Sequence, residues 1–183
     1  MKIIETKIKD LVIIKPKVFK DDRGHFLETY NQTVFEKLGI NFSDFHQDNQ
    51  SMSKKGVLRG LHFQKGGHAQ AKLVRVIKGS VLDVAVDLRE GSPTYGEWKS
   101  VLLTGDNNVM FFIPEGFAHG FVTLEDDTIF SYKCNKPYNK ESESGILWND
   151  PELNIDWMLY GDEPIMSGKD LILPTLKELN QNI

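Results

Sequence analysis

Residues 72–88 read KLVRVIKGSVLDVAVDL, two runs of β-favouring residues separated by a Gly-Ser dipeptide. Because side chains alternate between the two faces of a strand, the runs predict two strands, each with one apolar and one mixed face. A two-residue turn at the dipeptide would join them as a hairpin and place Lys72 opposite Asp87. The mixed face, with Lys72, Asp83 and Asp87, is either solvated with cross-strand ion pairs or turned toward a polar cavity.

Similar short runs follow one another along most of the chain and are separated by turn residues. Their many Val, Ile, Phe and Thr residues are typical of strands. Short strands at this spacing predict a mainly β fold, an antiparallel barrel or a jelly roll. Only two short helices are expected, at about Thr33 to Leu38 and, at the C-terminus, about Pro174 to Asn180. The runs are LVIIKPKVF, HFLETY, KLVRVIK, VLDVAVDL, WKSVLL, VMFFIP, HGFVTL and TIFSYK.

The length of 183 residues, with 40% hydrophobic content, predicts one domain over 1–183, with a barrel core at about 45–150. N-terminal strands and a C-terminal tail are expected to pack on this core. The start, MKIIETKIKD, does not resemble a secretory signal, and no apolar run approaches the roughly 20 residues of a membrane span. One cysteine, Cys134, fits a reducing compartment, so we expect a cytoplasmic protein. A net charge of -4 with dispersed basic residues argues against nucleic acid as a partner.

Three basic side chains interrupt the apolar pattern between Val57 and Gly79, at Arg59, His62 and Lys72. Lys and Arg are rarely buried without partners. We therefore expect these residues to line a cavity that receives an anion or a developing negative charge. The presence of Arg59 and His62 nearby in the sequence favours a position in the cavity, and not on a solvated outer face, for Lys72.

The segment IPEGFAHGF at 113–121 resembles the second motif of the cupin superfamily, P-x-G-x-x-H, whose histidine points into the barrel. His119 stands at that position. The first motif is altered, because Gln64 and Lys72 occupy places where a metal-binding cupin has a His and a Glu. A protonated lysine has no lone pair to give and repels a divalent cation. The resemblance therefore predicts a cupin-type frame without a catalytic metal.

A site with His and Lys but no metal suits proton abstraction next to a carbonyl group. An imidazole with a pKa of about 6.5 is a base at neutral pH. The Lys72 ammonium could stabilise the resulting oxyanion, a contribution of roughly 3 to 4 kcal/mol for a well-placed donor. Inversion of a stereocentre also needs a proton donor on the opposite face, for which Tyr132 is a candidate.

Over nearly its whole length the chain resembles the dTDP-4-dehydrorhamnose 3,5-epimerase family of the L-rhamnose pathway. The family resemblance implies a cofactor-independent, metal-free cupin homodimer that acts on a dTDP-sugar. The protons at C3 and C5, which flank the C4 ketone, would be removed and returned from the other side, converting dTDP-4-dehydro-6-deoxy-D-glucose into dTDP-4-dehydro-L-rhamnose. The resemblance rests on DDRGHFLETYN, FHQDNQSMSKKGVLRGLHFQ, QAKLVRVIKGSVLDVAVDLREGSPTYGEW, FFIPEGFAHGFVTL, YKCNKPYNKESESGILWNDPELNIDW and SGKDLILP.

The same resemblance implies roles for individual residues. His62 matches the base and Asp170 the carboxylate that orients it, so the tail is expected to fold back over the barrel. Tyr132 matches the proton donor and Lys72 the residue at the enolate oxygen. The positions matched to substrate binding or to the pocket wall are Arg23, Glu28, Gln47, Asp48, Asn49, Arg59, His119, Glu143 and Lys169.

Several features have weaker assignments. Phe19 and Phe26 are candidates to pack beside the thymine, although packing in the core is expected for at least one of them. The run LVIIKPKVF is a candidate to pair with a partner's sheet edge. Cys134 is expected to be a small strand residue. The histidines without a matched role are His25, His46 and His68.

Other interpretations stay open. An enzyme that inverts only C3 or only C5 would use the same base and acid. A metal-dependent dioxygenase or isomerase is possible on a cupin frame, although Lys72 argues against it, and a carbohydrate-binding cupin would keep the pocket without turnover. Taken singly, each candidate also fits a structural role: His62 and Tyr132 within the sheets, Asp170 at a cap and Lys169 at the surface.

Overall fold

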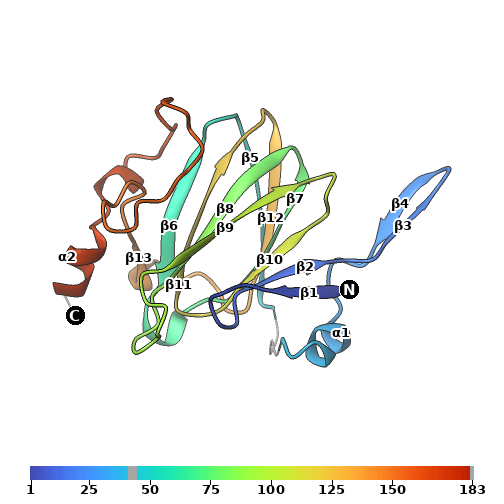
Figure 1. Ribbon diagram of the computed structural model, residues 1–183, viewed down its shortest axis with the longest axis horizontal. Helices are drawn as coiled ribbons and strands as arrows, with labels where there is room; N and C mark the ends of the chain where they lie inside the picture. Colours follow the sequence, from blue (N-terminus) through green and yellow to red (C-terminus); the bar gives the residue numbers. More distant parts are fainter. Residues whose placement is uncertain (41–44, 182–183) are drawn as a thin grey trace.

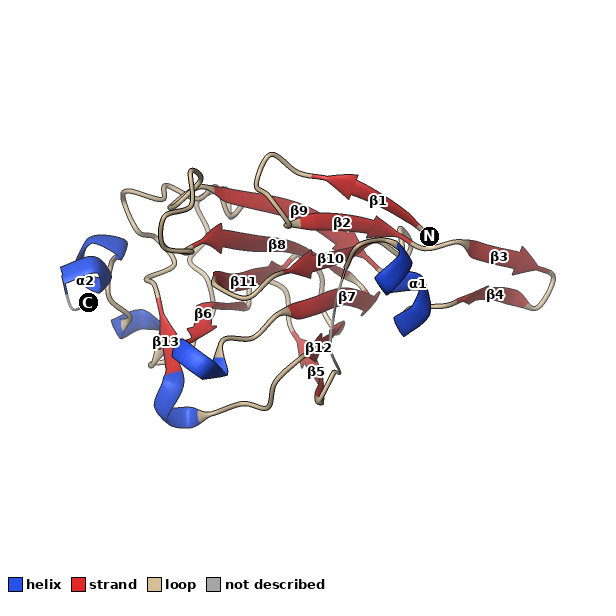
Figure 2. Ribbon diagram, turned by 90° about the horizontal axis from the view of Figure 1, so that it is seen from below, coloured by secondary structure: helices blue, strands red, loops and turns tan. Residues whose placement is uncertain are grey.

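The computed structural model describes residues 1–40 and 45–181, whose strands form two large antiparallel sheets and a two-stranded arm (Figures 1 and 2). The strands are β1 Lys2–Glu5, β2 Val12–Lys15, β3 Val18–Asp21, β4 Gly24–Leu27, β5 Gln47–Ser53, β6 Leu58–Gln64, β7 Lys72–Lys78, β8 Ser80–Asp87, β9 Trp98–Thr104, β10 Met110–Ile113, β11 Phe117–Thr123, β12 Thr128–Cys134 and β13 Glu143–Gly145. The helices are α1 Gln32–Lys37, α2 Leu176–Gln181 and the 3-10 turns η1 Gly66–His68, η2 Lys140–Ser142 and η3 Asp170–Ile172.

The two large sheets pack face to face. One has the strand order β1-β2-β10-β7-β12-β5, and the other the order β13-β6-β11-β8-β9. Their inner faces share one apolar core, to which Val74 and Phe130 contribute from the first sheet and Val81 and Phe121 from the second. The predicted mainly β fold with a few short helices is confirmed.

The predicted hairpin between residues 72–78 and 80–87 is wrong. Strand β7 pairs with β10 and β12, whereas β8 pairs with β11 and β9 in the other sheet. Gly79 has a φ of +80°, and Thr128 fills the space where a side chain would lie, so the dipeptide turns the chain from one sheet into the other. The predicted alternation survives this change, because Val74, Val76, Val81 and Ala85 all face the shared core.

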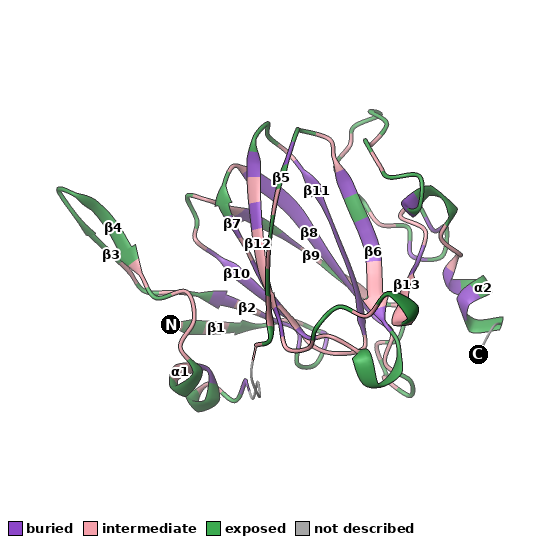
Figure 3. Ribbon diagram, turned by 180° about the vertical axis from the view of Figure 1, so that it is seen from behind, coloured by how far each residue is buried: buried purple, intermediate pink, exposed green. Residues whose placement is uncertain are grey.

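The C-terminal segment covers the outer face of the five-stranded sheet (Figure 1). Leu153, Trp157, Leu176 and Leu179 pack there against Leu82, Val84 and Val86 of β8. The expected C-terminal helix is present as α2, and Thr175 and Glu178 exchange hydrogen bonds at its start, with the Thr175 backbone N–H 2.8 Å from the Glu178 carboxylate. These contacts explain why β8 is buried along its whole length (Figure 3).

Helix α1 packs on the outer face of the six-stranded sheet, where Phe35 joins Ile14 and Met110 in a third apolar cluster. The expected helix is confirmed, but its cap is different: the Asn31 side chain, not Thr33, accepts a hydrogen bond from a backbone N–H of the first turn.

Strands β3 and β4 pair only with each other and project from the body as an exposed arm (Figures 1 and 3). The arm begins just after Pro16, which divides the predicted run LVIIKPKVF into β2 and β3. Phe19 and Phe26 on the arm are 51% and 69% exposed, so neither belongs to the core.

Candidate active site

A cavity of about 700 Å³ lies between the inner faces of the two sheets and is closed on one side by residues 165–170. His62 and Arg59 enter from β6 and His119 from β11, whereas Lys72 comes from β7 and Tyr132 from β12. Lys72, His119 and Tyr132 belong to three separate predicted strands, and the sheets bring them to one cavity with Arg59 and His62 of β6. The predicted residues that line it are Asn49, Arg59, His62, Lys72, His119, Tyr132, Lys169 and Asp170.

His62 is hydrogen-bonded to Asp170, with 2.7 Å between Nε2 and Oδ1. The Asp170 side chain is 4% exposed and that of His62 is 26% exposed, so the carboxylate lies behind the imidazole. Burial alone would raise the pKa of Asp170, but the hydrogen bond and charge of His62, together with the Gly60 backbone N–H, outweigh it and lower that pKa. A carboxylate can only accept a hydrogen bond, so the neutral imidazole carries its proton on Nε2. The lone pair of Nδ1 therefore remains available to act as a base.

Backbone contacts bring Asp170 to β6. The Leu58 N–H donates to the Ile165 carbonyl over 3.0 Å, and the Ile165 N–H donates to Gly56 over 2.8 Å. After the turn η3, the Leu147 N–H donates to Pro174, which ties the tail to the segment after β13. The tail therefore returns to the sheets, as the sequence predicted.

Two glycines allow β6 and β11 to approach closely beside the site. Gly60 has a φ of +123°, and a Cβ there would lie 2.6 Å from the Cα of Gly120. In this paired stretch His62 lies directly opposite His119, so both imidazoles reach the same cavity. Larger residues at either glycine would separate the strands.

Lys72 and Tyr132 lie on the wall formed by the six-stranded sheet. Burial lowers the pKa of Lys72, and the thiol of Cys134 and the carboxylates of Asp83 and Glu143 oppose this shift. Among the described residues, the Lys72 ammonium has no ion pair or hydrogen bond. Burial raises the pKa of Tyr132, so its phenol keeps its proton at neutral pH.

A second histidine–carboxylate pair stands beside the first. Nε2 of His119 lies 2.9 and 3.0 Å from the two carboxylate oxygens of Asp83 on β8. The Asp83 side chain is fully buried and that of His119 is 6% exposed. The strand alternation places Asp83 on the same strand face as Lys72, but Asp83 is not among the predicted site residues. The feature that could have indicated it is a carboxylate inside an otherwise apolar run.

An adjoining cavity of about 420 Å³ holds further predicted binding residues. Lys169 donates to Glu143 over 2.5 Å, and Tyr138, which the sequence did not single out, donates to the same carboxylate over 3.0 Å. The Gln47 side chain donates to Asn49 over 2.9 Å. The two cavities share Asn49, His62, Lys72, Tyr132 and Lys169, so they form one continuous recess.

Three predicted binding residues lie elsewhere in the chain. Arg23, on the turn of the arm, pairs with Asp21, and Glu28 accepts a hydrogen bond from Asn31. Asp48 faces the opposite side of β5 from Asn49 and forms an ion pair with Lys133 at 2.8 Å. Neither Arg23 nor Glu28 lines the recess, and the Asp48 carboxylate points away from it.

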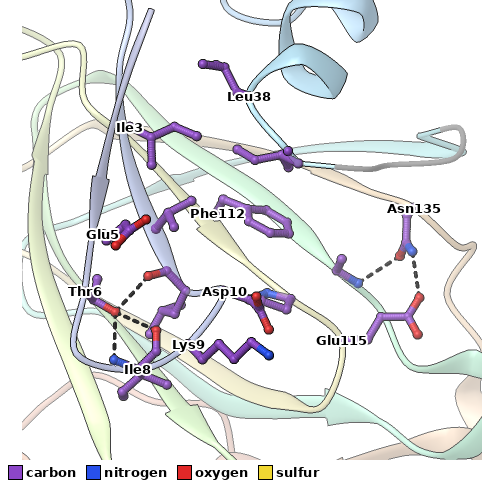
Figure 4. Close-up of a pocket in the computed structure, with 16 residues that line it drawn as sticks. Ile3, Glu5, Thr6, Ile8, Lys9, Asp10, Leu38, Phe112, Glu115 and Asn135 are labelled. Carbon is purple, nitrogen blue, oxygen red and sulfur yellow. Dashed lines mark hydrogen bonds between the residues drawn. The ribbon is translucent and has the colours of Figure 1, made fainter.

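A separate cavity of about 640 Å³ lies near the turn between β1 and β2 (Figure 4). Its wall combines Ile3 and Phe112 with Glu5, Lys9 and Glu115, and it contains none of the predicted site residues. Across residues 1–40 and 45–181, no group of three or more His, Cys, Asp and Glu side chains is arranged to hold a metal ion. Within the same ranges, no helix has the length and apolar character needed to span a membrane.

The fold and the recess define a cupin-like protein with acid and base groups between two sheets. Residues 5–178 match the family model described as dTDP-4-dehydrorhamnose 3,5-epimerase, and the chain belongs to this family. It is 52% identical over 180 residues to the dTDP-4-dehydrorhamnose 3,5-epimerase of Escherichia coli strain K12, covering 98% of this chain and 96% of that protein.

Two solved structures are similar along nearly all of their length. The dTDP-4-dehydrorhamnose 3,5-epimerase of Elizabethkingia anophelis NUHP1 has a TM-score of 0.94 and 51% identity, with 98% of each chain covered. An epimerase of Legionella pneumophila Philadelphia 1 in complex with dTDP-4-keto-L-rhamnose has a TM-score of 0.93 and 48% identity, covering 99% of this chain and 95% of that one.

Proposed function

We propose that the protein converts dTDP-4-dehydro-6-deoxy-D-glucose into dTDP-4-dehydro-L-rhamnose by inverting C3 and C5. The observation that carries this proposal is the 2.7 Å His62–Asp170 hydrogen bond in a recess that also contains Lys72 and Tyr132. Membership of the epimerase family and identity of about one half to its members support the same reaction.

In the proposed reaction His62 removes the proton from the carbon next to the C4 ketone. The electron pair of the broken C–H bond forms a carbon–carbon double bond, and the ketone oxygen becomes an enolate oxygen. Asp170 holds the imidazole in one orientation and stabilises the imidazolium that forms. This division of roles is supported by the greater exposure of His62, which reaches the recess while Asp170 lies behind it.

The Lys72 ammonium stabilises the enolate oxygen, and Tyr132 returns a proton to the carbon from the other face. His62 belongs to the five-stranded sheet and Tyr132 to the facing six-stranded sheet, which supports delivery from opposite sides. The raised pKa of Tyr132 keeps the phenol protonated before the transfer. The enolate returns to the ketone as the new C–H bond forms, which leaves His62 protonated and Tyr132 as the phenolate. C3 and C5 both flank the ketone, so the same groups can serve the second carbon once His62 has released its proton to solvent and Tyr132 has regained one.

The polar rim of the recess suits a nucleotide diphosphate. Arg59, at the mouth, has a guanidinium that matches phosphate oxygens in pairs. Lys169 adds a second positive charge. We assign substrate binding to the predicted residues that line the recess: Gln47, Asn49, Arg59, His119, Glu143 and Lys169.

Arg23, Glu28 and Asp48 lie outside the recess of their own chain, and we assign them to substrate binding at the recess of a second copy. The exposed aromatic pair Phe19 and Phe26 on the arm supports a homodimer in which the arm meets the partner. A solution mass from light scattering tests this: a monomeric mass at micromolar concentration would contradict the homodimer.

The proposed reaction needs neither a metal nor an organic cofactor. Lys72, in the place where a metal-binding cupin has its glutamate, supports this because an ammonium cannot ligate a cation. A cytoplasmic location is proposed on the single, buried Cys134, which fits a reducing compartment.

Product analysis tests the function. The purified protein is incubated with dTDP-4-dehydro-6-deoxy-D-glucose, and the sugar is analysed by proton NMR. Inversion at both carbons is expected, without added metal and after dialysis against a chelator. Inversion at only one carbon would assign a monofunctional epimerase, dependence on a metal would favour the metal-cupin alternative, and no reaction with bound sugar would favour a binding protein.

A further inference from the structure

The proposed reaction uses only one of the two histidine–carboxylate pairs in the recess. The other, Asp83 with His119, is more deeply buried: both Asp83 oxygens lie within 3.0 Å of the same imidazole nitrogen. His119 faces His62 across β6 and β11, so the second pair lies beside the first. His119 lines the recess, whereas the buried Asp83 does not, which indicates a supporting role for this carboxylate.

Asp83 fixes the tautomer and the orientation of His119. The Nε2–H group of His119 donates its hydrogen bond to the carboxylate, which leaves Nδ1 with no partner among the residues that the structure describes. The ring also stacks on Phe130, with 6.2 Å between centroids. Burial lowers the pKa of His119; the charge and hydrogen bond of Asp83 oppose this shift, whereas the charges of Lys72 and His62 add to it. The pKa is lowered on balance, so the imidazole is neutral at pH 7 and Nδ1 is an acceptor toward the recess.

Asp83 also balances the charge of Lys72. Glu143 is already bound by Lys169 and Tyr138, and burial raises the pKa of the Cys134 thiol so that it stays neutral. The pKa of Asp83 is also raised on balance by burial, although the charge and N–H of His119 and the charge of Lys72 oppose that rise and favour the carboxylate. An ammonium, a neutral imidazole and a carboxylate have no net charge together, the arrangement that a dry interior favours.

The titratable groups around Lys72 come from every neighbouring element of the recess. They are Arg59 and His62 on β6, Asp83 on β8, His119 on β11, Tyr132 and Cys134 on β12, Glu143 on β13, and Lys169 and Asp170 on the tail.

We propose that Asp83 is a positioning residue of the epimerase site: it orients His119 through Nε2 and places a buried carboxylate behind the wall that faces the Lys72 ammonium across the recess. The assignment rests on the function proposed above. Asp83 itself lies behind His119 and is not expected to touch the substrate.

The test compares Asp83→Asn with Asp87→Asn. Asp87 is an equally buried carboxylate on the same strand that binds Arg89, Ser92 and Thr94 instead of the site, which makes it a matched control. Lysine labelled with carbon-13 at Cε reports the titration of Lys72 by NMR, with Lys72→Met giving its assignment. Nitrogen-15 NMR of the histidine rings reports the tautomer of His119, and steady-state kinetics are measured on each folded variant.

In Asp83→Asn we expect Lys72 to lose its proton at a lower pH than in the parent, whereas Asp87→Asn leaves that titration unchanged. Turnover should fall roughly 10- to 100-fold, with KM changed by less than about threefold, and the alkaline limb of kcat should move to lower pH. An unchanged Lys72 titration, or a parent His119 protonated on Nδ1 instead of Nε2, would overturn the proposal. The tautomer of His119 is measured on the parent protein, so it tests the proposal even if the variant folds poorly or the parent does not epimerise the expected sugar.

Discussion

His62 and Asp170 are 108 positions apart in the chain and 2.7 Å apart in the structure. The Gly60 backbone N–H binds the same carboxylate, so Asp170 is held by two points of β6. The Asp170 backbone N–H in turn donates to the Ser167 carbonyl over 3.0 Å. The last strand-free part of the chain thus supplies the residue to which we assign the orientation of the proposed base.

Asp170→Asn should retain the fold and lose most activity. The amide can donate to Nε2, which would reverse the tautomer of His62 and turn its lone pair away from the substrate. A kcat reduction of roughly 10³- to 10⁴-fold is expected by analogy with the triad aspartate of serine proteases. Asp162→Asn, an exposed carboxylate of the same tail, is the control for kinetics and thermal unfolding. A kcat of Asp170→Asn near that of the control would contradict the role of Asp170.

Tyr132→Phe should separate proton removal from inversion. His62 can still remove the proton and return it to the same face, whereas the phenol that serves the other face is missing. In heavy water we expect deuterium to enter the starting sugar while inverted product falls below about a hundredth of the parent level. NMR measures both quantities, with the exposed Tyr95→Phe as control. Undiminished inversion would show that another group donates the proton.

Lys72→Met should reduce kcat roughly 10²- to 10³-fold, the range for the loss of one oxyanion donor. Methionine keeps most of the side-chain volume and removes the charge, and Lys78→Met at the exposed end of β7 is the control. Because burial lowers the pKa of Lys72, parent activity should decline as the pH rises through that lowered value, below the ordinary lysine value of about 10.4. The variant should lack this alkaline decline; a shared decline would exclude Lys72 as its origin.

Asp87→Asn should destabilise the protein in a pH-dependent way. Burial alone would raise the pKa of Asp87, but hydrogen bonds from Arg89, Ser92 and Thr94 outweigh it and hold that pKa far below its ordinary value. The stabilisation is therefore complete above about pH 4, the unfolded value, and declines as the pH falls toward the folded one. The free energy of unfolding should drop by roughly 2 to 3 kcal/mol at pH 7.

Denaturant unfolding at neutral and acidic pH measures this difference. It should be smaller at about pH 3 than at pH 7, because the unfolded parent chain then binds the proton. Asp106→Asn, at an exposed turn, should change the free energy of unfolding by less than about 0.5 kcal/mol. A larger difference in acid would contradict the assigned cause.

Local pattern predicted the strands but not all of their partners. The run at 72–78 is β7 with the same limits, and Lys72 and Asp83 face inward as their alternation indicated. The expected hairpin failed because a Gly-Ser dipeptide serves equally well as a tight turn and as a step between sheets. Only the long-range pairing of β7 with β12, and of β8 with β11, distinguishes the two.

The site residues likewise include some that local pattern predicts and others that depend on long-range pairing. Residues on inward strand positions, such as His62, Lys72 and Tyr132, meet in the recess as the family resemblance implied. Arg23 lies on an arm whose direction no local pattern determines, and it does not line that recess. Local sequence does not predict Asp83 as a site residue, because its partner, His119, is brought to it by pairing between strands far apart in the sequence.

The most direct measurement of the central claim is solvent exchange at the two carbons beside the ketone. The parent protein, His62→Ala and the exposed control His68→Ala are incubated with dTDP-4-dehydro-6-deoxy-D-glucose in heavy water, and deuterium at C3 and C5 is quantified by NMR and mass spectrometry. The parent and His68→Ala should carry deuterium at both carbons, and His62→Ala, with its fold retained by circular dichroism, should carry it at neither. Exchange in His62→Ala at the parent rate, or none in the parent, would contradict proton abstraction by the His62–Asp170 pair.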